Sequence, residues 1–139
     1  MPKRAYIAYR PRAAKVVLAP VVWVDSARSN LKQLSDEVQY RTGFALQEVQ
    51  RGRFPKEAAP LHGDLSGLIE LRVSDQSGTF RTVLTLKLSG TVYVLHVFQK
   101  KSPHGSEIPR RVIALIKRRL ARAKALHATP TETRTEVDP

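Results

Sequence analysis

The chain has 139 residues, of which 42% are hydrophobic, and it carries a formal net charge of +12. This length fits one domain with a single core, and the chain has no run of 18 apolar residues that could span a membrane. The absence of cysteine excludes disulfides and thiolate metal sites, and it suits a reducing compartment such as the cytoplasm.

The first elements are short and their boundaries are clear. Residues 1–20 contain three prolines and no helical stripe, which predicts an extended basic arm without the apolar segment of a signal peptide. The sequence VVWV at 21–24 predicts a strand. Asp25 or Ser26 then suits the N-cap of a short helix that runs to about Leu34.

A second helix and a long loop follow. Ser35 is a good N-cap, and Asp36 and Glu37 lie in the first turn, where the helix dipole favours acidic side chains. Gly52 is expected to end this helix. Residues 52–67 have the proline and glycine content of a loop.

The second half of the chain predicts three strands and a helix. The strands cover 67–74, 79–87 and 91–98, and short turns between them predict an antiparallel meander. From about Ser106 a basic amphipathic helix is expected, and from Ala128 a polar, disordered tail. The order β-α-α-β-β-β-α predicts an α+β domain over 21–127, with a small antiparallel sheet packed against helices. The apolar stripe of the last helix consists of Ile108, Val112, Ile113, Ile116 and Leu120.

Positive charge is concentrated at the two ends of the predicted fold. Residues 1–24 carry five basic and no acidic side chains, and residues 100–127 carry nine basic side chains against Glu107 alone. Residues 25–74 carry seven of each sign. Such segregation favours a polyanionic partner, either nucleic acid or an acidic protein, over a cationic surface kept for solubility.

Candidate chemical groups gather on the predicted meander. Strand parity places Glu70 and Arg72 on one face of its first strand. If the faces of the three strands coincide, basic groups converge on one concave side of the sheet. These groups are Arg72, Arg81, His96 and Lys100, with Phe98 beside them.

Each of these residues also has a purely structural interpretation, and the sequence leaves the structural and the functional interpretations open. Arg81 could pair with Glu70 across strands, and His96 and Phe98 could belong to the core. Other polar residues could simply be solvated or, for Glu107, serve the start of the last helix: Lys56, His62, Lys100, Lys101 and Glu107.

The available groups suit RNA cleavage by the substrate's own 2′-hydroxyl. The sequence contains no GxSxG, HExxH or P-loop motif, and His62, His96 and His104 lack metal-site spacing, so we expect neither metal nor cofactor. Preorganised cations stabilise the charge that a phosphate gains in the transition state. Burial and a neighbouring ammonium should lower the pKa of His96, and the neutral ring could accept the 2′-hydroxyl proton.

Three segments resemble the phage-derived branch of the RelE/HigB toxin family. They are GLIELRV, GTFRTVLTLK and VYVLHVFQKKS, and the last is the most specific because His, an aromatic residue and two lysines recur together in that branch. The resemblance implies a RelE-like fold and metal-independent cleavage of mRNA in the ribosomal A site. It also implies neutralisation by an antitoxin, typically a helix-turn-helix protein of the HigA type.

The resemblance also implies roles for individual residues. Arg81 matches the family's phosphate-contacting arginine, Lys100 a basic catalytic residue, and Arg72 the arginine of the ELR segment, with His96 as the proton-transfer candidate. The expected RNA contacts are Lys101, Phe98, Lys56, Arg110 and Arg111.

Two departures from the family keep other functions open. Some relatives carry lysines near the positions of Leu68 and Glu70, and some use a C-terminal tyrosine, whereas no tyrosine follows Tyr93 here. The alternatives are a non-catalytic toxin of the ParE type that inhibits DNA gyrase, and a basic phage-derived module that binds nucleic acid or a partner.

Overall fold

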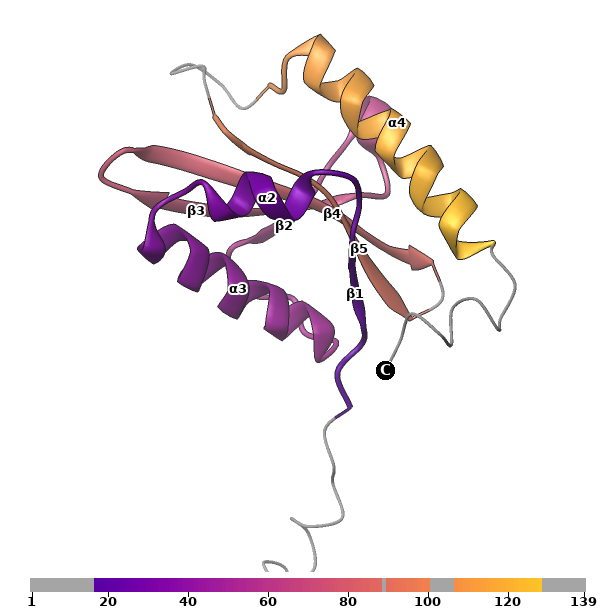
Figure 1. The fold of residues 1–139 in the computed structure, drawn as a ribbon, viewed down its shortest axis with the longest axis horizontal. Coiled ribbons are helices and arrows are strands. Elements are labelled where there is room, and N and C mark those ends of the chain that lie inside the picture. Colours follow the sequence, from indigo (N-terminus) through magenta and orange to yellow (C-terminus); the bar gives the residue numbers. More distant parts are fainter. Residues whose placement is uncertain (1–16, 89, 101–106, 129–139) are drawn as a thin grey trace, which may run out of the picture.

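The computed structural model describes residues 17–88, 90–100 and 107–128. Most of the expected arm and tail, and Lys101, lie outside these ranges. Within them the chain forms one five-stranded sheet with helices on both faces (Figure 1). The strands, in spatial order, are β1 (Val21–Trp23), β5 (Thr91–Gln99), β4 (Gly78–Leu88), β3 (Ile69–Asp75) and β2 (Ala58–Pro60).

The expected α+β class and the meander are confirmed. β3, β4 and β5 pair antiparallel in the order of the chain, because only short turns separate them. Two features were not expected. β1 pairs with β5 in parallel, so the sheet is mixed rather than wholly antiparallel. The loop over 52–67 contains β2 and a short 3₁₀ helix, η1 (Gly63–Leu65).

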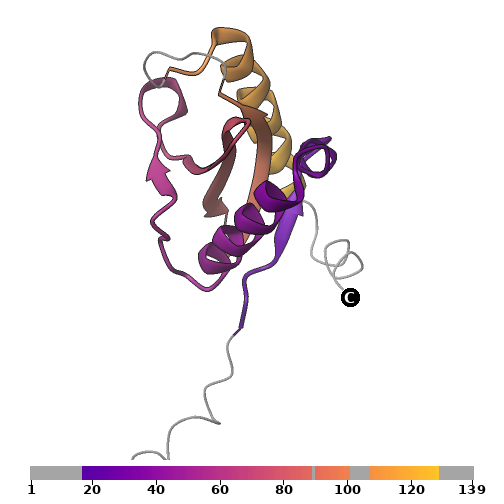
Figure 2. The same cartoon turned by 90° about the vertical axis from the view of Figure 1, so that its left-hand side faces the viewer.

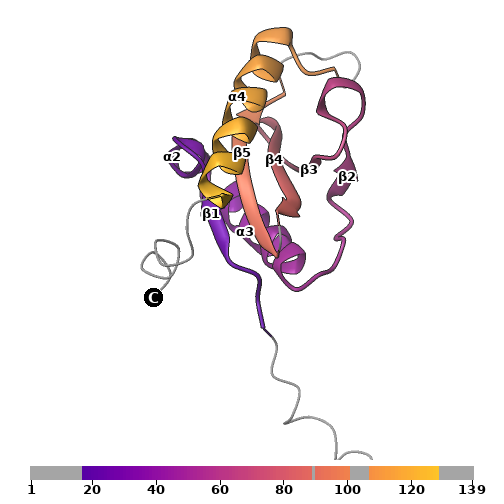
Figure 3. The same ribbon diagram turned by 90° about the vertical axis from the view of Figure 1, so that its right-hand side faces the viewer.

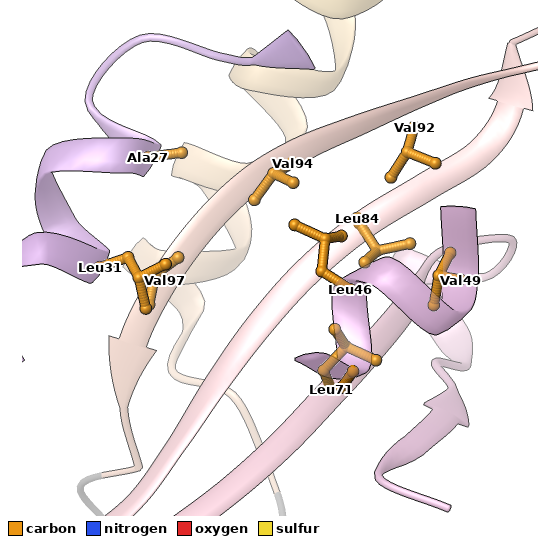
Figure 4. Packing of buried hydrophobic residues seen from close by; sticks show 10 residues of the cluster. Ala27, Leu31, Leu46, Val49, Leu71, Leu84, Val92, Val94 and Val97 are labelled. Atoms are coloured by element: carbon orange, nitrogen blue, oxygen red, sulfur yellow. The ribbon is translucent and has the colours of Figure 1, made fainter. Parts of the chain in front are cut away.

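Each face of the sheet buries a separate apolar cluster. On one face, α2 (Ala27–Lys32) and α3 (Asp36–Gln50) pack on the sheet (Figure 4). On the other face lies α4 (Arg110–His127), which Figure 3 shows in front of β5 and β4 with α3 behind them. The first cluster includes Leu31, Leu46, Val49, Leu84 and Val94, and the second includes Val83, Leu95, Ile116 and Ala123.

The signals at the ends of α3 work as expected. The Ser35 hydroxyl accepts a hydrogen bond from the backbone N–H of Val38 at 3.2 Å. Gly52 has a φ of +85°, the left-handed conformation that ends a helix. By contrast, Ser26 makes no side-chain cap bond for α2, and α4 begins at Arg110, later than the expected Ser106. Pro109 occupies its N-cap position.

Candidate functional site

The register of the meander brings the sequence-predicted residues onto one face of the sheet. Arg72 on β3 is directly opposite Arg81 on β4, which is opposite Phe98 on β5. In the adjacent row Glu70, Val83 and His96 are aligned in the same way. Val83 packs in the cluster beneath α4, so both rows belong to the α4 face.

A β-bulge in β5 makes this alignment possible. Val83 pairs with His96, but the next residue, Leu84, pairs with Val94, so Leu95 is the extra residue. The bulge lets Leu95 pack beneath α4 while His96 stays in the row of Glu70. Parity alone correctly related His96 to Phe98, because the bulge lies on the other side of His96.

Glu70 is the centre of the predicted basic group. Its carboxylate is 2.7 Å from Nε of Arg72 and 3.5 Å from Nε of Arg81. Glu70 and Arg81 are almost fully buried, with exposed fractions of 3% and 1%, whereas the side chain of Arg72 is 42% exposed. Burial lowers the pKa of Arg81, and the Glu70 carboxylate acts in the opposite direction. The cross-strand pairing of Arg81 with Glu70, one of the two readings that the sequence left open, is therefore present.

His96 faces a second arginine that sequence reasoning missed. Its Nδ1 lies 3.3 Å from Nη1 of Arg119 in α4, and its ring stacks on Phe98 with centroids 5.0 Å apart. Burial and the Arg119 guanidinium lower the pKa of His96 to about 4. The expected fall in pKa is confirmed, although the responsible neighbour is the guanidinium of Arg119.

This contact fixes the chemistry open to His96. A guanidinium is always a donor, so Nδ1 must accept and the ring proton must sit on Nε2. A neutral ring in this tautomer has no vacant nitrogen with which to accept the proton of a 2′-hydroxyl. The geometry therefore favours a structural role for His96 over the general-base role that the sequence suggested.

Arg119 ties α4 to the rest of the fold. It is 8% exposed, and it donates to the carbonyl of Leu95 at 2.9 Å and to the hydroxyl of Ser26 at 2.7 Å. Its Nε lies 3.8 Å from the carboxylate of Asp25. A signal was available in the sequence, because position 119 follows Ile116 by three residues and so falls on the apolar stripe of the helix.

Two clefts open beside Arg72. The larger, of about 660 Å³, lies between η1, β3 and the start of α4, which share one end of the molecule (Figure 2). The smaller, of about 510 Å³, lies beside β2, and Ala59 and Arg72 border both. Basic side chains line both clefts: Lys56 and Arg41 line the smaller one, Arg110 and Lys117 the larger one, and Arg72 borders both. His62 also lines the larger cleft.

The structure brings together some of the expected RNA contacts and not others. Lys56 and Arg110 line the clefts, whereas Arg111 is exposed on α4 outside both. Lys100 is half-buried, and its backbone N–H donates to the carbonyl of Thr79 at 2.7 Å. The pairing of β4 with β5 therefore continues to Lys100, one row beyond Arg81 on the same face. Phe98 packs against the α4 cluster, as its core interpretation predicts.

Acidic side chains also line the larger cleft. Asp64 lies 4.0 Å from Lys117, and Glu70 and Glu107 are the other two carboxylates. Across the described ranges, no three His, Cys, Asp or Glu side chains are grouped as a metal site requires. The helices described here include none that is long and apolar enough to cross a membrane.

Residues 29–121 match the family model described as phage derived protein Gp49-like. The chain belongs to this family. The match confirms the phage-derived family that the strand motifs indicated. A comparison with curated protein sequences found no match.

Solved toxin structures are similar in fold. A double arginine-to-alanine mutant of Escherichia coli RelE in the free state is 15% identical, with a TM-score of 0.49, over 76% of this chain and 98% of that one. The toxin–antitoxin complex RelBE2 of Mycobacterium tuberculosis is 24% identical, with a TM-score of 0.46, over 60% and 100%. The YoeB/ParE toxin of Agrobacterium tumefaciens is 20% identical, with a TM-score of 0.47, over 59% and 99%.

Proposed function

We propose that this Gp49-like protein is the toxin of a type II toxin–antitoxin system that cleaves mRNA on the ribosome. One observation carries the proposal: a buried carboxylate, Glu70, holds two arginines beside clefts lined by cations. The smaller cleft, where Arg41, Lys56 and Arg72 face Glu57 alone, suits an RNA backbone, and preorganised guanidinium groups suit a phosphate that gains charge. No metal is needed, because the RNA supplies its own nucleophile.

Exposure separates the roles of the two arginines. Arg72 is half exposed and borders both clefts, so it meets the scissile phosphate directly. Arg81 is as deeply buried as Glu70, but it lines neither cleft, whereas Glu70 lines the larger one, so Arg81 acts by positioning the carboxylate rather than by contacting RNA. This assignment transfers the phosphate contact from Arg81, which the family resemblance implied, to Arg72.

Glu70 replaces His96 as the proposed general base. It takes the proton of the 2′-hydroxyl as O2′ attacks phosphorus, and the bond from phosphorus to O5′ then breaks. The products are a 2′,3′-cyclic phosphate and a 5′-hydroxyl. The ammonium of Lys100, on the same face one row beyond Arg81, supplies the proton to the leaving oxygen.

The partners follow from this function. The substrate is mRNA in the ribosomal A site, and the site of action is the cytoplasm. A helix-turn-helix antitoxin of the HigA type neutralises the toxin. A short reading frame for such a protein beside this gene would support the assignment.

Cleavage by the purified protein in a translation extract tests the proposal. Wild-type protein should produce mRNA 5′ ends within codons, only when ribosomes are present. Arg72→Ala should lower the single-turnover rate by about 10²–10³, because it removes a cation from the transition state. Arg118→Ala removes the same charge from an exposed position outside both clefts, and it should cleave like wild type.

The occupied Nδ1 of His96 and the burial of Arg81 also favour a second candidate, a non-catalytic toxin of the ParE type that inhibits gyrase. Induced expression with sequencing of RNA ends separates the two. Growth arrest with DNA damage and no new mRNA ends would reject the ribonuclease and support gyrase inhibition. If expression causes neither growth arrest nor new mRNA ends, the protein is a basic binding module without toxicity.

A further inference from the structure

The larger cleft is balanced in charge and has apolar walls. Three Lys or Arg side chains and three acidic side chains line it: Arg72, Arg110, Lys117, Asp64, Glu70 and Glu107. The walls come from the chain around η1 and from the start of α4: Pro60, Leu61, Leu65, Ile108 and Ile113. Such a cleft has no surplus of cations for a phosphate, but its apolar surface suits the face of a nucleobase.

The smaller cleft has a surplus of positive charge. Arg41, Lys56 and Arg72 line it against Glu57 alone. Glu37, whose carboxylate is 3.5 Å from Arg41, lies outside the cleft, and its side chain is 64% exposed. A nucleic-acid backbone needs cations and a base needs apolar surface, so the two clefts suit different parts of the same strand.

Glu70 determines which nucleotide reaches the larger cleft. Its carboxylate lines this cleft and not the smaller one. Oε2 accepts a hydrogen bond from Nε of Arg72 at 2.7 Å, whereas Oε1 accepts none from any residue that the structure describes. In the proposed reaction the carboxylate takes the proton of the 2′-hydroxyl on C2′, and the base of the same nucleotide is bonded to the adjacent C1′. That base therefore lies beside Glu70, in the larger cleft.

The rows of the sheet order the remaining groups. Arg72 lies one row beyond Glu70, and Lys100 lies one row further in the same direction. The smaller cleft extends the same way, because Nη1 of Arg41 donates to the carbonyl of Ser74, which shares the row of Lys100. The attacking O2′, the phosphorus and the leaving O5′ are aligned in this reaction. The general base, the phosphate contact and the proton donor follow one another in that same order.

We propose that the larger cleft holds the base of the nucleotide whose 2′-hydroxyl attacks, and that the RNA strand runs 5′ to 3′ from the larger cleft to the smaller one. The inference rests on the proposed cleavage, because the roles of Glu70 and Arg72 set the direction. In the opposite direction the 2′-hydroxyl would lie toward the smaller cleft, away from the Glu70 carboxylate.

Two isomers of adenosine monophosphate test the direction without any cleavage. The 3′-monophosphate carries its base and phosphate as the attacking nucleotide does, so it can reach Arg72 with its base in the larger cleft. The 5′-monophosphate cannot do both. In an NMR titration of the full-length protein, the 3′ isomer should bind about tenfold more tightly, and the backbone amides of Leu65 and Ala114 should shift. Equal affinities, tighter binding of the 5′ isomer, or no binding of the 3′ isomer would overturn the proposal.

A matched pair of variants on α4 tests the place of the base. Ala114 is exposed and lines the larger cleft, and Ala121, about two turns later, is exposed and lines neither cleft. Ala114→Leu narrows the cleft and keeps a good helix former. It should weaken binding of adenosine 3′-monophosphate by about tenfold, and it should weaken the smaller cytidine 3′-monophosphate less. Ala121→Leu should bind both like wild type. An Ala114→Leu protein with wild-type affinity for both nucleotides would overturn the placement.

Cleavage of ribosome-bound mRNA by the same wild-type protein separates this inference from the proposed function. If mRNA is cut but the two adenosine isomers bind alike, the direction of the strand is wrong and the ribonuclease stands. If the 3′ isomer binds as expected but mRNA is not cut, the base site in the larger cleft is supported and the ribonuclease is rejected.

Discussion

Two buried arginines lie on the same side of the sheet, and they are neutralised in different ways. Arg81 belongs to β4 and pairs with Glu70, which is as deeply buried as Arg81 itself. Arg119 belongs to α4. Its acidic neighbour, Asp25, has its carboxylate 3.8 Å from Nε of Arg119, and its side chain is 40% exposed. Its shorter contacts are to neutral acceptors, the hydroxyl of Ser26 and the carbonyl of Leu95.

The difference indicates what each arginine does. A buried ion pair is seldom the most stable way to fill a sheet, because both charges lose water. The pairing of Arg81 with Glu70 is therefore consistent with a site that needs charge. The contacts of Arg119 reach Leu95 on β5 and Ser26 beside Asp25, which suits a structural link between α4, β5 and the turn after β1.

The largest expected effect on stability comes from replacing Glu70. Glu70→Gln removes the buried negative charge that faces Arg81, so the free energy of unfolding should fall by about 3–5 kcal/mol. Urea denaturation measures this fall. The double variant Glu70→Leu with Arg81→Met removes both charges and should recover most of the loss. If the double variant is no more stable than Glu70→Gln, the stability lost in Glu70→Gln does not come from the unpaired charge of Arg81.

The pH dependence of stability comes next. The pKa of His96 is about 4 in the folded protein against an ordinary 6.5, so below pH 6.5 the unfolded chain binds the extra proton. Stability should fall between pH 6.5 and 4, by up to about 3 kcal/mol from this residue, and this loss should level off below pH 4. His96→Gln should flatten that part of the curve. An unchanged curve in the variant would show that His96 titrates normally.

Sequence patterns predicted the main elements well, because strand alternation and turn residues are local signals. They also related His96 to Phe98 within one strand, since parity holds wherever no bulge intervenes, but only the register of the strands brings Arg81 onto the same face. They could not predict the parallel pairing of β1, because it joins segments distant in the chain. They missed β2 because its three residues, Ala58–Pro60, are too few to show an alternating pattern and lie in a stretch rich in proline and glycine. Nor could they rank Arg72 above Arg81, since exposure depends on how the sheet is covered.

The link made by Arg119 should have a smaller effect than the Glu70 pair. Arg119→Met keeps the aliphatic length but loses the bonds to Ser26 and Leu95, so stability should fall by about 2 kcal/mol. Asp25 keeps its ion pair with Arg122 at the surface, so the loss of Arg119 adds little cost there. Removing the guanidinium should also raise the pKa of His96 partway toward 6.5, because burial remains. NMR titration of the His96 ring measures that rise, and Arg118→Met is the matched control. A pKa that stays near 4 would show that burial alone sets it.

The smallest expected effect is that of His96→Gln on cleavage. Glutamine offers an amide oxygen to Nη1 of Arg119 in place of Nδ1, so the contact can persist. The loss of the ring stacked on Phe98 should cost about 1 kcal/mol of stability at pH 7. If Glu70 is the base, the single-turnover rate on ribosome-bound mRNA should stay within about threefold of wild type. General-base catalysis contributes about 10²–10⁴ to a rate, so a loss of that size in a folded variant would return the role to His96. In that case Arg119 would have to release Nδ1 when RNA binds, and Arg119→Met, which frees this nitrogen, should then cleave at least as fast as wild type.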